Sequence, residues 1–132
     1  MIDEIRLDGL HQVAMTCADL DRSVEFYESK LGLPLRARFD PPGLAFFDVG
    51  GVRLSLQKVD EVGASGSVLY FRVADIEAAT TLLQRKKKIA FEREPELVFR
   101  DEQGQFGSAG EEEWMAFFRD PDQNLLALVA RK

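Results

Sequence analysis

The stretch Cys17-Ala18-Asp19-Leu20-Asp21-Arg22-Ser23-Val24 decides the fold, because a similar stretch, Val73-Ala74-Asp75-Ile76-Glu77-Ala78-Ala79-Thr80, follows it 56 residues later. In each copy a strand-like segment ends just before an aspartate that is able to cap a helix. A second pair, Ala45-Phe46-Phe47 and Ala116-Phe117-Phe118, lies further along each half at an offset of 71 residues. This internal repeat predicts two similar modules, whose equivalent positions can be compared.

The first half has the pattern of a strand, a helix and three more strands. Residues 10–17 alternate as a strand does, and Asp19 begins a helix that Gly32 ends. A turn with two prolines and the Gly50-Gly51 pair separate the strands that follow. These strands are expected over 35–39, 44–48 and 52–58.

The second half repeats this order. A strand over 67–73 leads to a helix capped by Asp75, and three strands are expected over 89–99, 113–119 and 125–130. The apolar spacing predicts that Ile76, Ala79 and Leu83 make the buried face of this helix, with Leu82 beside them. The basic run at 86–88 is assigned to the helix end, where cations offset the helix dipole. The polar excursion over 100–112 has no counterpart in the first half.

These elements predict an α+β fold in a single domain of 132 residues. Module one is expected over about 8–58, a linker over 59–66 and module two over about 67–130. The eight strands would form a concave sheet with the helices outside. The net charge of −6 argues against a nucleic-acid partner, and no apolar run is long enough to span a membrane. The acidic N-terminus has no apolar signal core, so a cytoplasmic location is expected.

Three segments together resemble the vicinal oxygen chelate superfamily, which includes glyoxalase I, bleomycin-resistance proteins, extradiol dioxygenases and methylmalonyl-CoA epimerase. They are Leu10-His11-Gln12-Val13-Ala14-Met15 with the helix after it, the hairpin Gly50-Gly51-Val52-Arg53-Leu54, and the closing segment from Phe117 to Leu125. One departure is Gln123, which stands where the family usually has a glycine. The resemblance implies a homodimer that binds a small molecule.

The resemblance also implies a divalent metal ion held by the first and last strands of each module. Its ligand positions fall at Gln12 and Ser55, and the repeat places their counterparts at Val68 and Ala127. Only Gln12 is a plausible metal ligand, because valine and alanine cannot coordinate and a neutral serine is a poor ligand for zinc or iron. His11 is the only histidine, and alternation turns it toward the helices. No cofactor is therefore predicted, and an ion held weakly by Gln12 and nearby carboxylates is the alternative.

Alternation predicts which side chains line the concave face. The polar candidates for ligand binding are Gln12, Arg53, Ser55, Gln57, Tyr70 and Arg72. Such a face suits a small anionic or hydrogen-bonding ligand. The structural alternative is that both arginines pair with nearby acids, such as those of the 92–96 stretch. Adjacent phenylalanines point to opposite faces, so one of each Phe-Phe pair is expected on this face.

Trp114 follows three glutamates and is a further ligand-binding candidate. A tryptophan beside acids suits a pocket rim for a flat cationic ligand, because the face of its ring attracts cations. A strand residue that packs in the core or at a dimer interface explains it equally well. The single cysteine, Cys17, is interpreted as a small buried core residue.

Three functions remain open from the sequence. The first is a metal-free protein of the glyoxalase and bleomycin-resistance type that binds a small molecule. The second is a lyase, isomerase or epimerase, or a dioxygenase-related member, with a non-standard site, for which Tyr70, Glu113 and His11 are the candidates. The third is a non-catalytic interaction module whose contact surface is the excursion 100–112.

Overall fold

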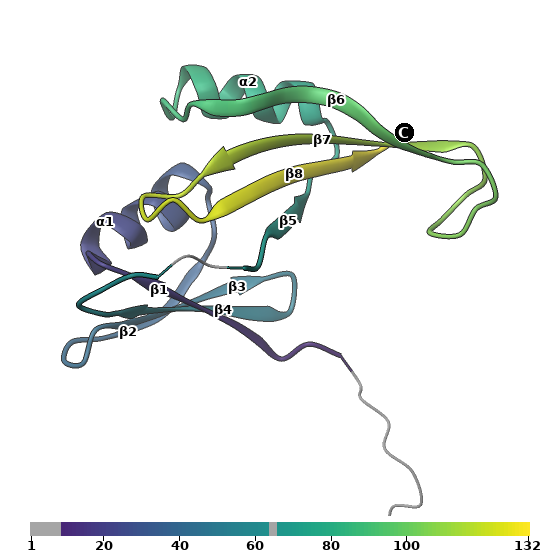
Figure 1. Ribbon diagram of the computed structural model, residues 1–132. Helices are drawn as coiled ribbons and strands as arrows, with labels where there is room; N and C mark the ends of the chain where they lie inside the picture. Colours follow the sequence, from purple (N-terminus) through teal and green to yellow (C-terminus); the bar gives the residue numbers. More distant parts are fainter. Residues whose placement is uncertain (1–8, 64–65) are drawn as a thin grey trace, which may run out of the picture. The chain divides into compact units, whose positions relative to one another are not determined.

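The computed structural model describes residues 9–63 and 66–132. The chain divides into two compact units with a boundary between Val62 and Gly63, and we call them module one and module two. The elements of module one are β1 (Gln12–Cys17), α1 (Leu20–Val24), the π-helix η1 (Glu25–Lys30), β2 (Leu35–Phe39), β3 (Leu44–Val49) and β4 (Val52–Lys58) (Figure 1). Those of module two are β5 (Leu69–Arg72), α2 (Ile76–Arg85), β6 (Phe91–Asp101), β7 (Glu111–Arg119) and β8 (Leu125–Arg131).

Module one is a four-stranded sheet in the order β1-β4-β3-β2, with β1 parallel to β4 and the other pairs antiparallel. Its helix begins where the sequence predicts, because the side chain of Asp19 accepts a hydrogen bond from the backbone N–H of Arg22 at 3.1 Å. Tyr27 and Phe47 are fully buried between the helix and the sheet, with ring centroids 5.9 Å apart. Burying such side chains contributes about 1.5–3 kcal/mol each.

The sequence predicts one regular helix up to Gly32, but only the first part of this helix is an α-helix. Its second part is the π-helix η1, in which the N–H of Leu31 donates to the carbonyl of Phe26 at 3.0 Å. The wider turn lets the adjacent residues Phe26 and Tyr27 both reach the core. Gly32 then ends the helix with a φ of 76°, which confirms its predicted role.

Module two is a four-stranded sheet in the order β5-β8-β7-β6, and α2 contacts β6, β7 and β8. Figure 1 shows α2 lying along one face of this sheet. The side chain of Asp75 accepts from the backbone N–H of Ala78 at 3.0 Å, so it caps α2 as predicted. Ile76, Phe118 and Leu126 are almost completely buried in this core.

The two modules share their strand pairing as well as their element order. Both are β-α-β-β-β units, which confirms the α+β class. Even an irregularity recurs, because the register of β2 against β3 shifts between Leu35 and Ala37, and that of β6 against β7 shifts between Phe91 and Arg93. The repeat offset of 56 relates these two pairs of residues, so the duplication extends to the detail of the backbone.

The buried face of α2 differs from the predicted one. Thr80 is buried, whereas Leu82 is 46% exposed and Ala79 is only half-buried. At 100° a residue, Thr80 lies beside Ile76 and Leu83 on the helix surface, and Leu82 lies about 120° from that line. Periodicity counts apolar residues, and it therefore missed a threonine on the correct side.

Strand β6 is longer than predicted and runs through Pro95 to Asp101. It is an edge strand, where a residue without an N–H is tolerated because that side of the strand has no partner. The polar excursion is accordingly shorter than predicted and links β6 to β7 over 102–110.

Part of the expected linker, 64–65, and the acidic N-terminus lie outside the described residues. None of the helices in the described ranges has the length and apolar character that crossing a membrane requires.

Candidate functional site

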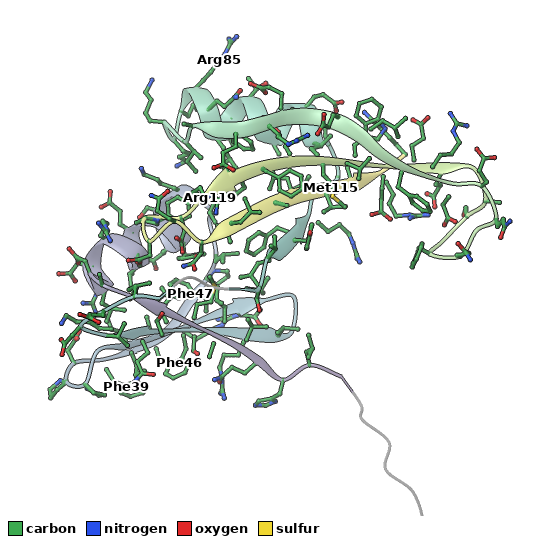
Figure 2. The ribbon with its side chains drawn as sticks, in the orientation of Figure 1. Phe39, Phe46, Phe47, Arg85, Met115 and Arg119 are labelled. Carbon is green, nitrogen blue, oxygen red and sulfur yellow. The ribbon has the colours of Figure 1, made fainter. Side chains whose placement is uncertain are left out.

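The sheet of module one has one face against its helix and one opposite. Phe47 lies on the helix side, and Figure 2 shows Phe46 and Phe39 pointing to the other side. We call this second face the Arg53 face. Its residues in or beside the ladder are Gln12, Phe39, Phe46, Arg53, Ser55 and Gln57. One phenylalanine of the pair thus faces away from the core, as predicted.

The side chain of Arg53 is held by three neighbours on this face. Its Nε donates to Oε1 of Gln12 at 2.7 Å, and one of its terminal nitrogens lies 3.5 Å from Nε2 of His11. Its guanidinium carbon lies 5.4 Å from the ring centroid of Phe46, which is within the range of a cation–π contact. We call His11, Gln12, Phe46 and Arg53 the Arg53 cluster.

The two module-one positions that the family resemblance assigns to metal ligands lie side by side. Nε2 of Gln12 donates to Oγ of Ser55 at 3.4 Å, and Oε1 of Gln12 accepts from Arg53. Gln57 lies further along the same face, paired with Thr16 in the ladder, and contributes nothing to this contact.

The sequence prediction for His11 is wrong. His11 precedes β1, is exposed, and reaches the same guanidinium as Gln12. The carbonyl of His11 accepts from the N–H of Arg53 at 3.0 Å, but His11 precedes Gln12, the first paired position of β1, so regular strand alternation does not extend to its side chain. The interpretation of a lone surface histidine is the one that agrees with the structure.

Within its own module, neither Arg53 nor Arg72 forms an ion pair with a described carboxylate. For Arg72, the structural alternative of a pair with the 92–96 stretch of the same module therefore does not hold. The acids of that stretch bind other partners, with Glu92 on Arg119 and Glu96 on Arg93, each at 2.8 Å. Asp48 is the ladder neighbour of Arg53 on β3, but its carboxylate accepts from the N–H of Gly51. The guanidinium of Arg53 instead leans toward β1.

The sheet of module two presents different chemistry on the equivalent face. In register, Ala127 pairs with Tyr70 on one side and Phe117 on the other, as Ser55 pairs with Ala14 and Phe46 in module one. The rings of Tyr70 and Phe117 meet edge to face with centroids 6.4 Å apart, and Ala127 between them is fully buried. We call this the Tyr70 face, and Arg72 lies on it opposite Val129.

The divalent ion implied by the family resemblance does not fit this donor set. Ala127 has no donor atom, and Val68, which precedes β5, has none either. Gln12 already gives its oxygen to Arg53. Within residues 9–63 and 66–132, no group of three or more His, Cys, Asp or Glu side chains is placed to hold a metal ion.

Trp114 lies on the opposite face from Tyr70, since it shares its side of β7 with the buried residues Ala116 and Phe118. Its indole N–H donates to Oε1 of Glu112 at 3.1 Å. The ammonium of Lys132 lies 4.6 Å from its ring centroid and also binds Glu77 of α2. The chain's own lysine therefore occupies the place that a cationic ligand would take, which favours the packing interpretation of Trp114.

Module two contains an ionic cluster that the sequence analysis did not predict. The carboxylate of Asp101 is fully buried and accepts from Nη2 of Arg131 at 2.9 Å and from the backbone N–H groups of Gln105 and Phe106. Burial opposes its charge, but the two backbone donors and Arg131 outweigh that effect and hold the pKa of Asp101 below its ordinary value. Arg131 also binds Glu113 at 2.7 Å. This cluster fixes the start of the 102–110 hairpin.

Within module two, the enzyme candidates Tyr70 and Glu113 do not contact each other. Glu113 is held by Arg131, and it lies four residues along β7 from Phe117, the partner of Tyr70. That separation is roughly 13 Å along a strand, too far for a hydrogen bond.

A sequence model of the "Glyoxalase/Bleomycin resistance protein/Dioxygenase superfamily" matches residues 9–128. The chain belongs to this superfamily. It is 26% identical to the uncharacterized protein YraH of Bacillus subtilis, over 90% of this chain and 95% of that one. Among solved structures, a glyoxalase/bleomycin resistance protein/dioxygenase from Alicyclobacillus acidocaldarius has a TM-score of 0.66 at 26% identity, covering 93% of this chain and 91% of its own. Lactoylglutathione lyase from Agrobacterium tumefaciens has a TM-score of 0.70 at 18% identity, covering 95% of each chain, and this likeness concerns the fold alone.

Proposed function

We propose that this glyoxalase-superfamily protein binds a small molecule at the Arg53 face and does so without the divalent metal of the related enzymes. The proposal rests mainly on the residues that stand at the family's metal-ligand positions in both modules. Ala127 and Val68 cannot coordinate, and Gln12 is engaged with Arg53. Polar groups beside an aromatic surface are the usual composition of a binding site for a small ligand.

Metal analysis of protein purified without a chelator tests the metal-free part. We expect less than one equivalent of zinc, nickel, iron or manganese per chain, and an unchanged melting temperature after treatment with EDTA. One tightly bound equivalent that is lost in Gln12→Ala would overturn this part of the proposal.

A thermal-shift screen of neutral, anionic and cationic small molecules, run in EDTA, tests the binding part. A ligand that binds only the folded state raises the melting temperature, and the stabilisation grows with the logarithm of the ratio of ligand concentration to Kd. If no compound stabilises the protein, the Arg53 face is not a binding site and the proposed function fails.

The homodimer and the cytoplasmic location expected from the sequence belong to the same proposal. Light scattering coupled to size-exclusion chromatography measures the first, since a dimer has twice the chain mass of 14.9 kDa. Fractionation of cells that express the tagged full chain measures the second.

A further inference from the structure

Arg53 differs from most other arginines of the chain in its partners. The protein has 23 acidic and 17 basic residues, so carboxylates are in excess. Ion pairs with carboxylates are formed, among the described arginines, by Arg36, Arg38, Arg93, Arg100, Arg119 and Arg131. Arg53 is oriented instead by a neutral amide and an aromatic ring. Within the described part of module one, its positive charge is therefore held in place without a paired carboxylate.

The geometry of the guanidinium leaves one edge for a ligand. Arginine has five N–H donors in a planar fork, and Gln12 takes only the one on Nε. The contact to His11, at 3.5 Å, involves one terminal nitrogen and is long for a hydrogen bond. The remaining donors on the two terminal nitrogens form the edge that matches a planar oxyanion in a bidentate manner.

An aromatic surface adjoins this edge. Phe46 stacks against Arg53 on one side and meets Phe39 edge to face on the other, with ring centroids 6.0 Å apart. Phe39 is 52% exposed, and Figure 2 shows it on the same side of the sheet as Phe46. A ligand anchored at Arg53 would thus find an apolar contact next to its charged group.

We propose that Arg53 supplies the fixed positive charge of this face, and that the ligand is an aromatic or apolar molecule bearing a carboxylate. The carboxylate pairs with the terminal nitrogens of Arg53, and the apolar part packs against Phe39 and Phe46. Gln12 is then a positioning residue, since it holds Nε and sets the direction of the fork. This inference rests on the proposed function, because it names the ligand class of the same face.

Calorimetric titration with benzoate, benzamide and formate in EDTA tests the assignment. Benzoate has both the charge and the ring, benzamide lacks only the charge, and formate lacks only the ring. We expect benzoate to bind more tightly than either of the others. Equal binding of benzoate and benzamide, or no binding of benzoate, would overturn the anionic ligand class.

Variants assign the charge to Arg53. In Arg53→Gln we expect the affinity for benzoate to fall about tenfold or more, because hydrogen bonds between charged groups are lost. The matched control is Arg85→Gln, which removes the same charge from an exposed position on α2 (Figure 2). The control should change the affinity less than about twofold, since Arg85 is not part of the Arg53 face and screened surface charges contribute little. An equal loss in both variants would mean that net charge alone attracts the anion.

Two further variants test the planar shape of the Arg53 guanidinium and the apolar contact of Phe39 separately. Arg53→Lys keeps the charge without the planar fork, and we expect it to recover only part of the affinity. Phe39→Ala should weaken benzoate and leave formate unchanged. Far-UV circular dichroism confirms that each variant is folded.

If neutral compounds stabilise the protein in the screen while benzoate fails, the ligand class is wrong and the proposed function survives. If nothing binds, both fail.

Discussion

The two modules have the same backbone fold, but different side chains on the sheet face that points away from the helix. Gln12, Arg53 and Ser55 give module one a polar, hydrogen-bonded face. At the equivalent place module two has the apolar pair Tyr70 and Phe117 over a buried alanine. Shared packing constrains the side of each sheet that faces its helix. The opposite side is not constrained in this way, and its residues have diverged.

The connection before the last hairpin is the other difference. Module two extends β6 and β7 into a hairpin whose start is fixed by Asp101 and Arg131, and module one has only a short turn at the same place. The carboxylate of Asp101 binds both Arg131 and the backbone of the connection. Two backbone N–H groups of that turn, those of Gln105 and Phe106, donate to the carboxylate of Asp101.

The largest expected effect concerns the two cores. Phe47→Ala and Phe118→Ala remove equivalent, fully buried rings, and each should lower the free energy of unfolding by about 3–5 kcal/mol. Urea denaturation followed by circular dichroism measures both. If the modules form one domain, as the sequence predicts, each change shifts a single transition.

Two separate transitions, with only one shifted in each variant, would show that the modules unfold independently. Leu82→Ala is the control, because its side chain is 46% exposed and should cost no more than about 0.5 kcal/mol.

Asp101→Asn tests the ionic cluster that only module two has. We expect a melting temperature about 5 °C lower or more at neutral pH, because Arg131 loses its buried partner. The pKa of Asp101 is lowered from 3.8 in the folded state, so its stabilisation is fully present above that value and is lost as the pH falls below it.

The melting temperature of the wild type should accordingly decrease as the pH is lowered past about 4, and that of the variant should depend less on pH. Glu102→Gln, on the same hairpin but exposed, is the control and should keep the wild-type pH profile. An unchanged slope in Asp101→Asn would contradict the role assigned to this carboxylate.

The helix caps offer the closest comparison between the modules. Asp19→Ala and Asp75→Ala each remove one acceptor from an N-terminal backbone N–H, at 3.1 and 3.0 Å. Each should cost about 1 kcal/mol, measured by urea denaturation. The asparagine variants keep the acceptor and should cost much less. A clear inequality between the two alanine variants would mean that the caps are equivalent in geometry only.

The smallest effect concerns the hairpin turns. Gln123 has a φ of 69°, where glycine is favoured, and Gln123→Gly should stabilise the protein by about 0.5–1 kcal/mol. Gly50→Ala makes the opposite change in module one at a φ of 58° and should destabilise by a similar amount. Thermal unfolding measures both, and destabilisation by Gln123→Gly would show that the glutamine side chain stabilises its turn.

Local signals made most of the fold predictable. Asp19, Asp75 and Gly32 mark helix ends through their own backbone and side-chain chemistry, and the structure places them as expected. The pairs Phe46-Phe47 and Phe117-Phe118 divide between two faces because strand side chains alternate. The π-helical turn at η1 and the burial of Thr80 were missed, because both depend on what packs against the helix.

The sequence by itself determined the duplication, the order of the elements, the family, and the absence of usable metal ligands at Val68 and Ala127. Only the tertiary structure decided how the remaining polar residues combine. The contact between Gln12 and Arg53 joins residues 41 positions apart and exists because β1 pairs with β4 in one parallel register. Pairing of Asp101 with Arg131 likewise depends on three neighbouring strands. Helix caps and the repeated motifs can be recognised in short stretches of sequence, whereas such contacts form only when the sheet sets the register of distant segments.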